Sequence, residues 1–556
     1  MREDFGGWVK SGKPWIWLNA AAVSASLIMV LGLLGLIAVN GLGHFWPSVL
    51  WDMQYRTPDG SVQRLIGEIS ETERISVERL REAGELVEVY GDAVHIDRYL
   101  IKTGNRDVSG LDFRWINEPA IISRSTPEAL VELERTEWGN FYGFLQDIRE
   151  GGTLVAGQDA AWHELQPRLE RVHEIRKLIR KLEKGDIGAI NYKLEQLRLE
   201  RRGLELDGEN TPAAIADIES RRQALQAAFV KLQKQLEARY QEIRRDSVTM
   251  LAMGGETVDI PLANIVRAWQ PNAMGPVDKT GFYFSSLWGF VSEDPREANT
   301  EGGIFPAIFG TVMMVMLMSL LVTPFGVVAA VYLREYATQG PLTRLIRIAV
   351  NNLAGVPSIV YGVFGLGFFV YFLGGNIDQL FFPEALPAPT FGTPGLMWAS
   401  LTLALLTVPV VIVATEEGLS RIPRSIREGS LALGATKAET LWRTVLPMAS
   451  PAMMTGVILA VARAAGEVAP LMLVGVVKLA PALPLDGNSP FIHLDRKFMH
   501  LGFHIYDVGF QSPNVEAARP LVYATALLLV VVIIALNLTA IAIRNRLRER
   551  YRTLDN

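Results

Sequence analysis

Two ionisable residues, Arg463 and Glu467, stand four positions apart inside an otherwise apolar segment. Four-residue spacing places two side chains on one face of a helix. A charged side chain in the middle of a bilayer costs about 2.5–3.5 kcal/mol on insertion scales, so it is expected to face protein or a water-filled path. The guanidinium group is a fork of donors that suits oxyanions. The pair therefore predicts a transient site for an anion crossing the membrane, with Glu467 holding Arg463 in place. A structural ion pair between two helices is the alternative.

A second candidate lies where polar and small residues interrupt another apolar run, at Asn351, Asn352, Gly355, Pro357 and Ser358. Proline at a first helical position can mark the restart of a helix. Backbone N–H groups exposed at such a restart favour an anion. We therefore count Asn351, Asn352 and Ser358 as candidate path residues. A proline kink, with small residues that allow close helix packing, is the alternative.

Other patterns that could carry chemistry are weaker. Residues 7–14, GWVKSGKP, approach the spacing of a nucleotide-binding P-loop, but Pro14 stands where a Ser or Thr hydroxyl should meet Mg²⁺. We expect this chain not to hydrolyse ATP. His500 and His504 have the helical spacing of zinc ligands, near His493 and Asp495, but no carboxylate motif supports them. The absence of cysteine excludes disulfides, cysteine catalysis and iron–sulfur clusters. We therefore predict no catalytic residue, metal or bound cofactor in this chain.

The composition indicates a membrane protein with one polar region. The chain has 556 residues, of which 49% are hydrophobic and 20% charged, and the charged residues concentrate in 41–303. This division excludes a disordered chain and a single soluble domain. The net charge of −5 argues against a nucleic-acid binder.

Six segments are apolar and long enough to be considered as membrane spans, since a bilayer core of about 30 Å needs about 20 helical residues. The first is predicted to be a retained anchor, because its apolar run exceeds the 7–15 residues that are usual in a signal peptide. The third is the interrupted one. The segments are 18–39, 304–333, 348–373, 398–413, 453–477 and 521–543.

Short basic loops set the predicted orientation, because Lys and Arg mark the cytoplasmic side. Basic residues concentrate in the loop 416–451 and in the tail 544–556, whereas 374–397 has none. We therefore expect 1–40 to comprise a cytoplasmic N-terminus and the first span, 41–303 to be an extracytoplasmic insert, 304–543 to form a core with five spans, and 544–556 to be a cytoplasmic basic tail.

The insert is predicted to be α+β. Residues 248–260 read as a β-hairpin, and two charged helical runs lie within about 160–245 on either side of a turn at 207–212. Each run carries apolar residues at alternating steps of three and four, which is typical of a coiled-coil hairpin. Two helices packed on a globular core are the alternative. Residues 282–291 are too short to span and are expected at the membrane interface.

The loop 416–451 carries a recognisable motif. Two short helices are expected on either side of Gly434, because glycine readily adopts the left-handed conformation that ends a helix. On the residues alone, this is either a solvated basic helix pair or a docking element for a soluble partner. The segment resembles the EAA coupling loop of ABC importer permeases, E-small-small-x3-G-x9-I-x-L-P, with Thr444 in place of the isoleucine. The matching residues are Glu428, Gly429, Ser430, Gly434, Leu446 and Pro447.

Four further stretches, in order, sharpen this resemblance: 302–311, 332–337, 352–360 and 463–471. From about residue 300 to the end, and in the first span, the chain resembles PstA-type permeases of the phosphate-specific ABC transporter. The resemblance implies a mainly α, polytopic protein with six transmembrane helices of the type I importer fold, in the bacterial cytoplasmic (inner) membrane. The large insert resembles an extra N-terminal domain found in a subset of these permeases.

What the resemblance implies for function is a permease subunit for inorganic phosphate import. Its partners would be a second, PstC-like permease, a dimeric PstB-like ATPase that uses ATP and Mg, and an extracytoplasmic PstS-like phosphate-binding protein. The family's matching arginine, Arg463 here, is implicated in phosphate passage, and the mechanism is expected to be alternating access. The alternatives are a permease for another oxyanion, such as sulfate, molybdate or phosphonate, and a membrane-anchored coiled-coil protein for assembly or signalling.

Overall fold

The structure is a computed structural model that describes residues 11–57, 60–82, 93–512 and 515–552. Within these residues, six helical segments are long and apolar enough to cross a membrane. The chain is therefore a multi-pass membrane protein, and the number of spans agrees with the prediction. The spans are Pro14–Gly43, Phe305–Tyr336, Ser358–Phe381, Leu396–Ser420, Lys437–Gly466 and Ala518–Arg546.

Two of the six predicted spans have wrong boundaries. The third span starts at Ser358 and not at 348, because the preceding residues form a separate amphipathic helix, α10 (Pro341–Leu353). The fifth span runs over 437–466, so it starts and ends earlier than the predicted 453–477. Proline explains both breaks: Pro357 disfavours helix in the residue before it, and Pro470 does the same just after the fifth span. Hydropathy alone does not register these breaks.

The spans pack through small residues. Helix α13 (Leu396–Ser420) lies centrally between α9 (Phe305–Val331) and α16 (Leu446–Gly466), and α16 also packs on α19 (Val515–Arg552). A Cβ added at Gly326 would lie 2.6 Å from Val411, and one at Gly456 would lie 2.7 Å from Ala414. Glycine at these positions therefore sets the helix spacing, as is usual in membranes.

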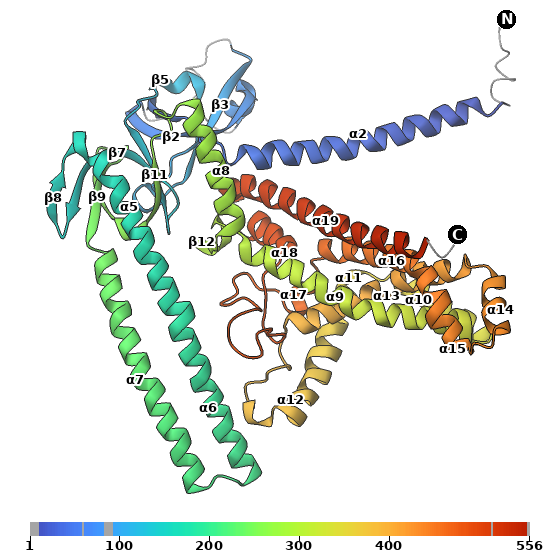
Figure 1. Ribbon diagram of the computed structural model, residues 1–556. Coiled ribbons are helices and arrows are strands. Elements are labelled where there is room, and N and C mark those ends of the chain that lie inside the picture. Colours follow the sequence, from blue (N-terminus) through green and yellow to red (C-terminus); the bar gives the residue numbers. More distant parts are fainter. Residues whose placement is uncertain (1–10, 58–59, 83–92, 513–514, 553–556) are drawn as a thin grey trace, which may run out of the picture.

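The first span, α2 (Lys13–Gly43), lies apart from the others. Figure 1 shows it projecting away from the remaining spans, meeting α19 only near its C-terminal end. At that contact, a Cβ on Gly41 would lie 2.9 Å from the Tyr523 carbonyl oxygen. Most of the apolar surface of α2 is exposed within this single chain. The last helix, α19, continues to Arg552, so the basic residues predicted as a tail extend the helix.

In the described residues, the insert contains a five-stranded antiparallel sheet of order β4-β3-β2-β1-β5 and a six-stranded sheet of order β10-β9-β7-β6-β11, with β8 paired to β7. The predicted hairpin at 248–260 is present as β9 and β10, with Gly255 at φ 82° in the turn. The strands are β1 (Leu50–Arg56), β2 (Val62–Ser76), β3 (His95–Lys102), β4 (Phe113–Asn117), β5 (Ile121–Ser125), β6 (Leu130–Arg135), β7 (Phe141–Glu150), β8 (Thr153–Ala156), β9 (Asp246–Leu251), β10 (Thr257–Pro261) and β11 (Ile265–Trp269).

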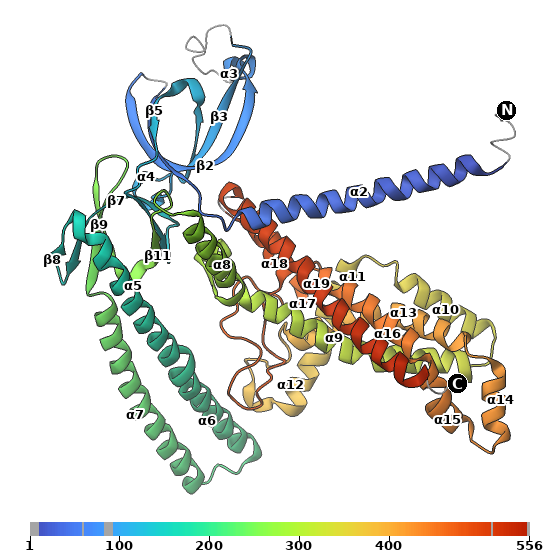
Figure 2. The same cartoon turned by 45° about the horizontal axis from the view of Figure 1, so that its top comes forward.

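A long helical hairpin rises from the six-stranded sheet (Figures 1 and 2). Its first arm is α5 (Gln158–Arg180), a π-helical segment η3 (Lys181–Ile187) and α6 (Gly188–Asp207), and its second arm is α7 (Pro212–Ile243). The apolar side of α5 packs into the core of the sheet, through residues such as Leu165 and Val172. Farther out, α6 and α7 pair with each other. The packing of α5 on the sheet agrees with helices packed on a globular core, and the coiled coil stays a prediction.

The hairpin leans toward a loop of the membrane core. On α6, the Tyr192 hydroxyl donates a hydrogen bond to the Ser489 carbonyl oxygen, and its ring lies edge-on to His493 at 6.3 Å between centroids. α6 also contacts the turn η8 (Pro383–Ala385). The insert therefore touches the core at a point remote from its own connection to the spans.

The connection itself is a compact segment. Helix α8 (Pro276–Ser292) covers the predicted interfacial residues 282–291 and is followed by β12 (Pro295–Arg296), η5 (Glu297–Asn299) and β13 (Glu301–Gly302). Glu297 forms an ion pair with Arg106 of the insert, while Asn299 donates to the Lys478 carbonyl oxygen of the core at 2.7 Å. The connector 293–302 is thus fastened on both sides. The interfacial position of α8 stays a prediction.

Candidate translocation site and coupling loop

Arg463 and Glu467 lie next to each other, although they are not on the same helix. Arg463 lies in the last turn of α16, whereas Glu467 is the first residue beyond that helix, with φ −80° and ψ 131°. The Arg463 Nε atom is 3.7 Å from the Glu467 Oε1 atom. The prediction that both residues lie on one helical face is therefore wrong, and the pair forms across the end of the helix.

The guanidinium group of Arg463 retains donors for a ligand. Its side chain is 32% exposed and that of Glu467 is 22% exposed, so both reach solvent space within this single chain. At 3.7 Å the contact is an ion pair without a short hydrogen bond. Such a pair neutralises the arginine while leaving N–H groups available, which suits weak and reversible binding of an anion.

Two breaks in the membrane helices meet beside this pair. One precedes α11 (Ser358–Phe364), where Pro357 starts the new helix, and the other follows α16. A Cβ on Gly362 would lie 2.7 Å from the Pro470 Cα atom, so the first turn of α11 packs directly on the chain just after Glu467. Arg463 also lies close enough to Tyr361 to interact with it electrostatically. The fold thus brings the region of Ser358 to that of Arg463, although about a hundred residues separate them.

The other two path candidates lie on the far side of the break. Asn351 and Asn352 are exposed near the end of α10, and no contact with Arg463 is found among the described residues. The break is braced by the Tyr361 hydroxyl, which donates to the Leu353 carbonyl oxygen at 2.5 Å. Backbone oxygens left by a broken helix need such partners inside a membrane.

Sequence reasoning missed one polar residue at this meeting point. The Thr402 hydroxyl, on α13, is buried and has no hydrogen-bond partner in the described part of the chain. A Cβ on Gly365 would lie 2.3 Å from this hydroxyl oxygen. An isolated threonine in an apolar helix gives no signal in a sequence, because such hydroxyls usually bond to their own helix.

The coupling-loop residues gather in a helix-turn-helix. Glu428, Gly429 and Ser430 lie on α14 (Arg424–Ala432), which ends before Gly434 at φ 90°. The second helix, α15 (Lys437–Thr440), begins with a capping box between Thr436 and Glu439. The Ser430 and Thr440 hydroxyls lie 2.9 Å apart and join the two helices. The chain then continues through η9 (Leu441–Val445) to Leu446 and Pro447 at the start of α16.

This loop presents an apolar outer surface. Leu433 is 91% exposed and Trp442 is 74% exposed, and Glu428 and Gly429 are exposed beside them. Large exposed apolar side chains in such a cluster mark an interaction surface.

An ion pair fastens the loop to the end of the second span. Arg427 donates to the Glu335 carboxylate at 2.8 Å and to the carbonyl oxygens of Leu419 and Ile422. Glu335 lies in η6 (Tyr332–Tyr336), within the stretch 332–337 that the sequence had singled out. Lys437 also donates to the Glu335 carbonyl oxygen and lies over the Tyr336 ring, 4.6 Å from its centroid. Sequence reasoning had counted Arg427 only as a basic loop residue.

The histidine candidates lie between residues 493 and 504. His500 starts α18 (Leu501–Tyr506) and accepts a hydrogen bond from the Gly502 N–H, while His504 is buried in that helix. His493 pairs with Asp486 at 2.9 Å. Within the described residues, no group of three or more potential metal ligands is found, and Asp495 joins none. Residues 7–10 of the P-loop-like stretch lie outside the described residues.

Comparison with known proteins shows which family has this arrangement. Residues 322–553 match the family model of the binding-protein-dependent transport system inner membrane component. The phosphate transport system permease protein PstA 1 of Mycobacterium tuberculosis (strain CDC 1551 / Oshkosh) is 34% identical over 281 residues, which are 50% of this chain and 80% of that protein. The chain belongs to the PstA family of phosphate transport system permeases. The family model covers the coupling loop, Arg463 and Glu467.

Two further relatives show how widely the similarity extends. The probable PstA permease of Methanocaldococcus jannaschii is 29% identical over 298 residues, covering 52% of this chain and 91% of that protein. The PstC permease of Mesorhizobium japonicum is 29% identical over 231 residues, covering 40% of this chain and 65% of that protein. This PstA-family chain is thus similar to both kinds of phosphate transport permease.

Proposed function

We propose that this protein is the permease subunit of an ATP-driven importer of inorganic phosphate. The observation that carries the proposal is the family membership, established over the region that contains the paired Arg463 and Glu467. The guanidinium group of Arg463, held near Glu467 where two broken helices meet, would supply hydrogen-bond donors for an oxyanion inside the membrane. In this proposal the chain would supply no catalytic group, and the energy would come from ATP hydrolysed with Mg by a separate ATPase.

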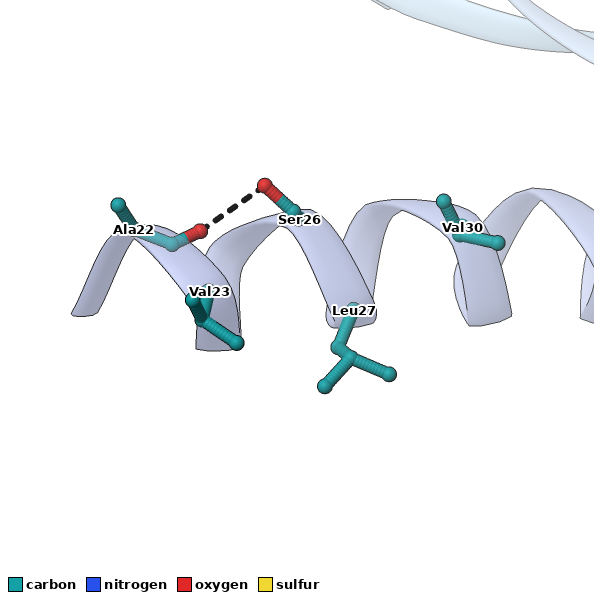
Figure 3. A pocket seen from close by; sticks show the side chains of 5 residues that line it. All are labelled: Ala22, Val23, Ser26, Leu27 and Val30. Carbon is teal, nitrogen blue, oxygen red and sulfur yellow. Dashed lines mark hydrogen bonds between the residues drawn. The ribbon is translucent and has the colours of Figure 1, made fainter. Parts of the chain in front are cut away.

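A second, PstC-like permease is the proposed partner within the membrane. The support is the first span, whose surface is exposed along most of its length in the single chain. Figure 3 shows five residues that line a groove on α2, with Ala22, Ser26 and Val30 along one side of the helix and Val23 and Leu27 along the other. The Ser26 hydroxyl donates back to the Ala22 carbonyl oxygen at 2.9 Å, so it offers no unpaired polar group to a neighbour. Small residues of this kind let another helix approach closely.

A PstB-like ATPase dimer is the proposed partner of the coupling loop, through Glu428, Gly429, Ser430 and Gly434. The apolar cluster of Leu433 and Trp442 supports this docking. The helical segment from Lys437 to Gly466 is continuous, so a push on α15 would travel along one rod to Leu446, Pro447 and then Arg463. Rigid-body movement of such a rod is a common way to switch access from one side to the other. Binding at Arg463 should be weak, because tight binding would trap the ion.

We infer the orientation from the basic loops. Both termini and the coupling loop would face the cytoplasm, and 41–303 would face outward, where a PstS-like protein delivers phosphate. The proposed location is the bacterial inner membrane. The support is the concentration of arginines in 416–451 and at the C-terminal end of α19.

Labelled-phosphate uptake by cells carrying the wild-type chain or Arg463→Gln, at matched membrane abundance, tests the proposal. Labelled sulfate serves as the competing substrate. Arg198→Gln, on the exposed surface of α6, is the matched control. Loss of phosphate uptake in Arg463→Gln alone supports a path through Arg463. Normal uptake would make the pair structural. Sulfate uptake without phosphate uptake by the wild type would retain the permease but change the substrate to another oxyanion.

A further inference from the structure

A pocket at the root of the helical hairpin has features of an anion site that are independent of the membrane path. It has a volume of about 280 Å³ and lies between α5, η3, the end of α7 and the turn η4 (Leu262–Asn264). Its apolar floor includes the buried side chains of Ile179 and Ile243. This volume is many times the roughly 30 Å³ that a water molecule occupies in the liquid, so the pocket has room for a small polyatomic ion.

Positive charge dominates the lining of this pocket. Arg176, Arg180 and Arg244 line it, and Glu183 is the single carboxylate among the lining residues. The Glu183 carboxylate already accepts a hydrogen bond from the Tyr240 hydroxyl. The lining thus carries three guanidinium groups and one carboxylate, and Asp294 neutralises part of this positive charge from outside the lining.

Arg176 is the most constrained of the three arginines. Its Nη2 atom donates to the carbonyl oxygens of Ala263 and Ile265, at 2.9 and 3.1 Å, and within the described residues it has no ion-pair partner. Burial, together with the nearby charge of Arg296, lowers the pKa of Arg176. The Glu293 carboxylate interacts electrostatically with Arg176 without forming an ion pair, so a bound anion would stabilise this half-buried cation further. The other N–H groups of its guanidinium are available for this role.

The neighbouring arginines differ in what they bind already. Arg244 lies over the Tyr240 ring, 5.9 Å from its centroid, and forms no ion pair within the described part of the chain. Arg180 is paired with Asp294, which also accepts from Lys184 at 3.0 Å. Asp294 belongs to the connector 293–302, which leads into the second span. An anion that recruits Arg180 would therefore compete with the connector for that side chain.

We propose that this pocket binds a small oxyanion, inorganic phosphate in the first instance, as a second anion site outside the membrane path. The convergence of Arg176 and Arg244 on one pocket, with no ion pair to either across the described ranges of the chain, carries the inference. The site goes beyond the proposed function, which concerns only passage through the spans. Arg180 lines the pocket and also pairs with Asp294 of the connector. An anion in the pocket would therefore weaken the contact that holds the connector near the start of the second span.

The test is equilibrium binding of labelled phosphate to the full-length protein in nanodiscs, in the Arg463→Gln background, so that the membrane path does not contribute. Saturable binding should persist in that background. Adding Arg176→Gln and Arg244→Gln should raise the dissociation constant at least about tenfold, because each removes a charged hydrogen-bond donor. The control is Arg198→Gln with Arg202→Gln, two exposed arginines on α6 away from the pocket.

Several outcomes would overturn the proposal. Binding that disappears with Arg463→Gln alone would assign the anion to the membrane path. Binding that chloride abolishes at matched ionic strength, or that survives the double variant, would show that the pocket has no specific role. Arg244→Gln alone, at an exposed position, guards against misfolding and should weaken binding in the same direction. Phosphate uptake is measured separately, so a failed permease assignment would not be mistaken for a failed pocket.

Discussion

Replacing Arg427 by methionine tests whether the coupling loop works through its anchor on the second span. The Arg427 and Glu335 side chains are 19% and 12% exposed, and their charged atoms are 2.8 Å apart. Removing one member of a buried pair costs about 3–5 kcal/mol, because the other charge is left without its partner. The partial exposure of this pair puts the expected loss of stability at the lower end, at about 3 kcal/mol. Methionine keeps an unbranched apolar stem and removes the guanidinium group, so the change is mainly one of charge and donors.

The assay compares phosphate uptake with ATP hydrolysis in the reconstituted transporter. With α14 released from η6, ATP hydrolysis should continue while uptake falls, because a push on the loop no longer reaches the second span. Arg424→Met, on the same helix but with an exposed side chain, is the matched control and should behave as wild type. Thermal unfolding of the full chain measures the stability of each variant.

A double variant separates folding from coupling. Arg427→Met combined with Glu335→Met replaces the ion pair by apolar side chains, which is often neutral for stability. It should unfold near the wild-type temperature and still transport poorly. Wild-type uptake and stability in Arg427→Met would refute the reasoning, since the pair would then carry neither the fold nor the coupling.

Two further predictions concern single residues. Gly434→Val should uncouple ATP hydrolysis from uptake, because the backbone at φ 90° costs a non-glycine residue about 1–2 kcal/mol and the turn of the coupling loop is therefore strained. The packing of the folded chain should change little, because a Cβ at this position meets nothing within 4 Å. Uptake equal to that of a Gly429→Ala control would contradict the docking assignment. Glu301→Gln should change how unfolding depends on pH, since burial raises the pKa of the Glu301 carboxyl to about 7. The folded state then holds a proton that the unfolded chain releases, so the wild type should lose at most about 3 kcal/mol as the pH rises from 4.5 through 7. The glutamine variant should lack that loss in a pH series of thermal unfolding, and a parallel loss in both proteins would exclude Glu301 as its source.

The membrane spans were predictable because each needs about 20 apolar residues, whatever its neighbours are. Pro357 indicated a restart of the third span, but the break after Gly466 was not predicted, because a broken helix is tolerated in a membrane only where other protein groups bind its backbone. At the first break that group is the Tyr361 hydroxyl, on the next helix. No pattern in a sequence shows that such a partner will be in reach.

The candidate site was predictable in its residues but only partly in its geometry. Arg463 and Glu467 stood out as charges in an apolar segment, and their contact forms although Glu467 is outside the helix. Arg427 could not be assigned a role, since its partner Glu335 is 92 positions away. Similarly, a three-four spacing does not say whether an apolar helix face meets a sheet, as α5 does, or another helix, as α6 does.

The isolated first span has a consequence for how the protein is made. Its contact within the chain is with α19, where Gly41 meets Ala524, so the two helices leave the ribosome far apart in time. At about 5–20 residues per second, the intervening chain takes on the order of half a minute to a minute and a half to synthesise. During that interval α2 has to persist in the bilayer by its own backbone hydrogen bonds and its apolar surface. Its long apolar span, Pro14–Gly43, allows the helix to stay in the bilayer without neighbouring spans. The insert 41–303 can fold before the core that it contacts has been made.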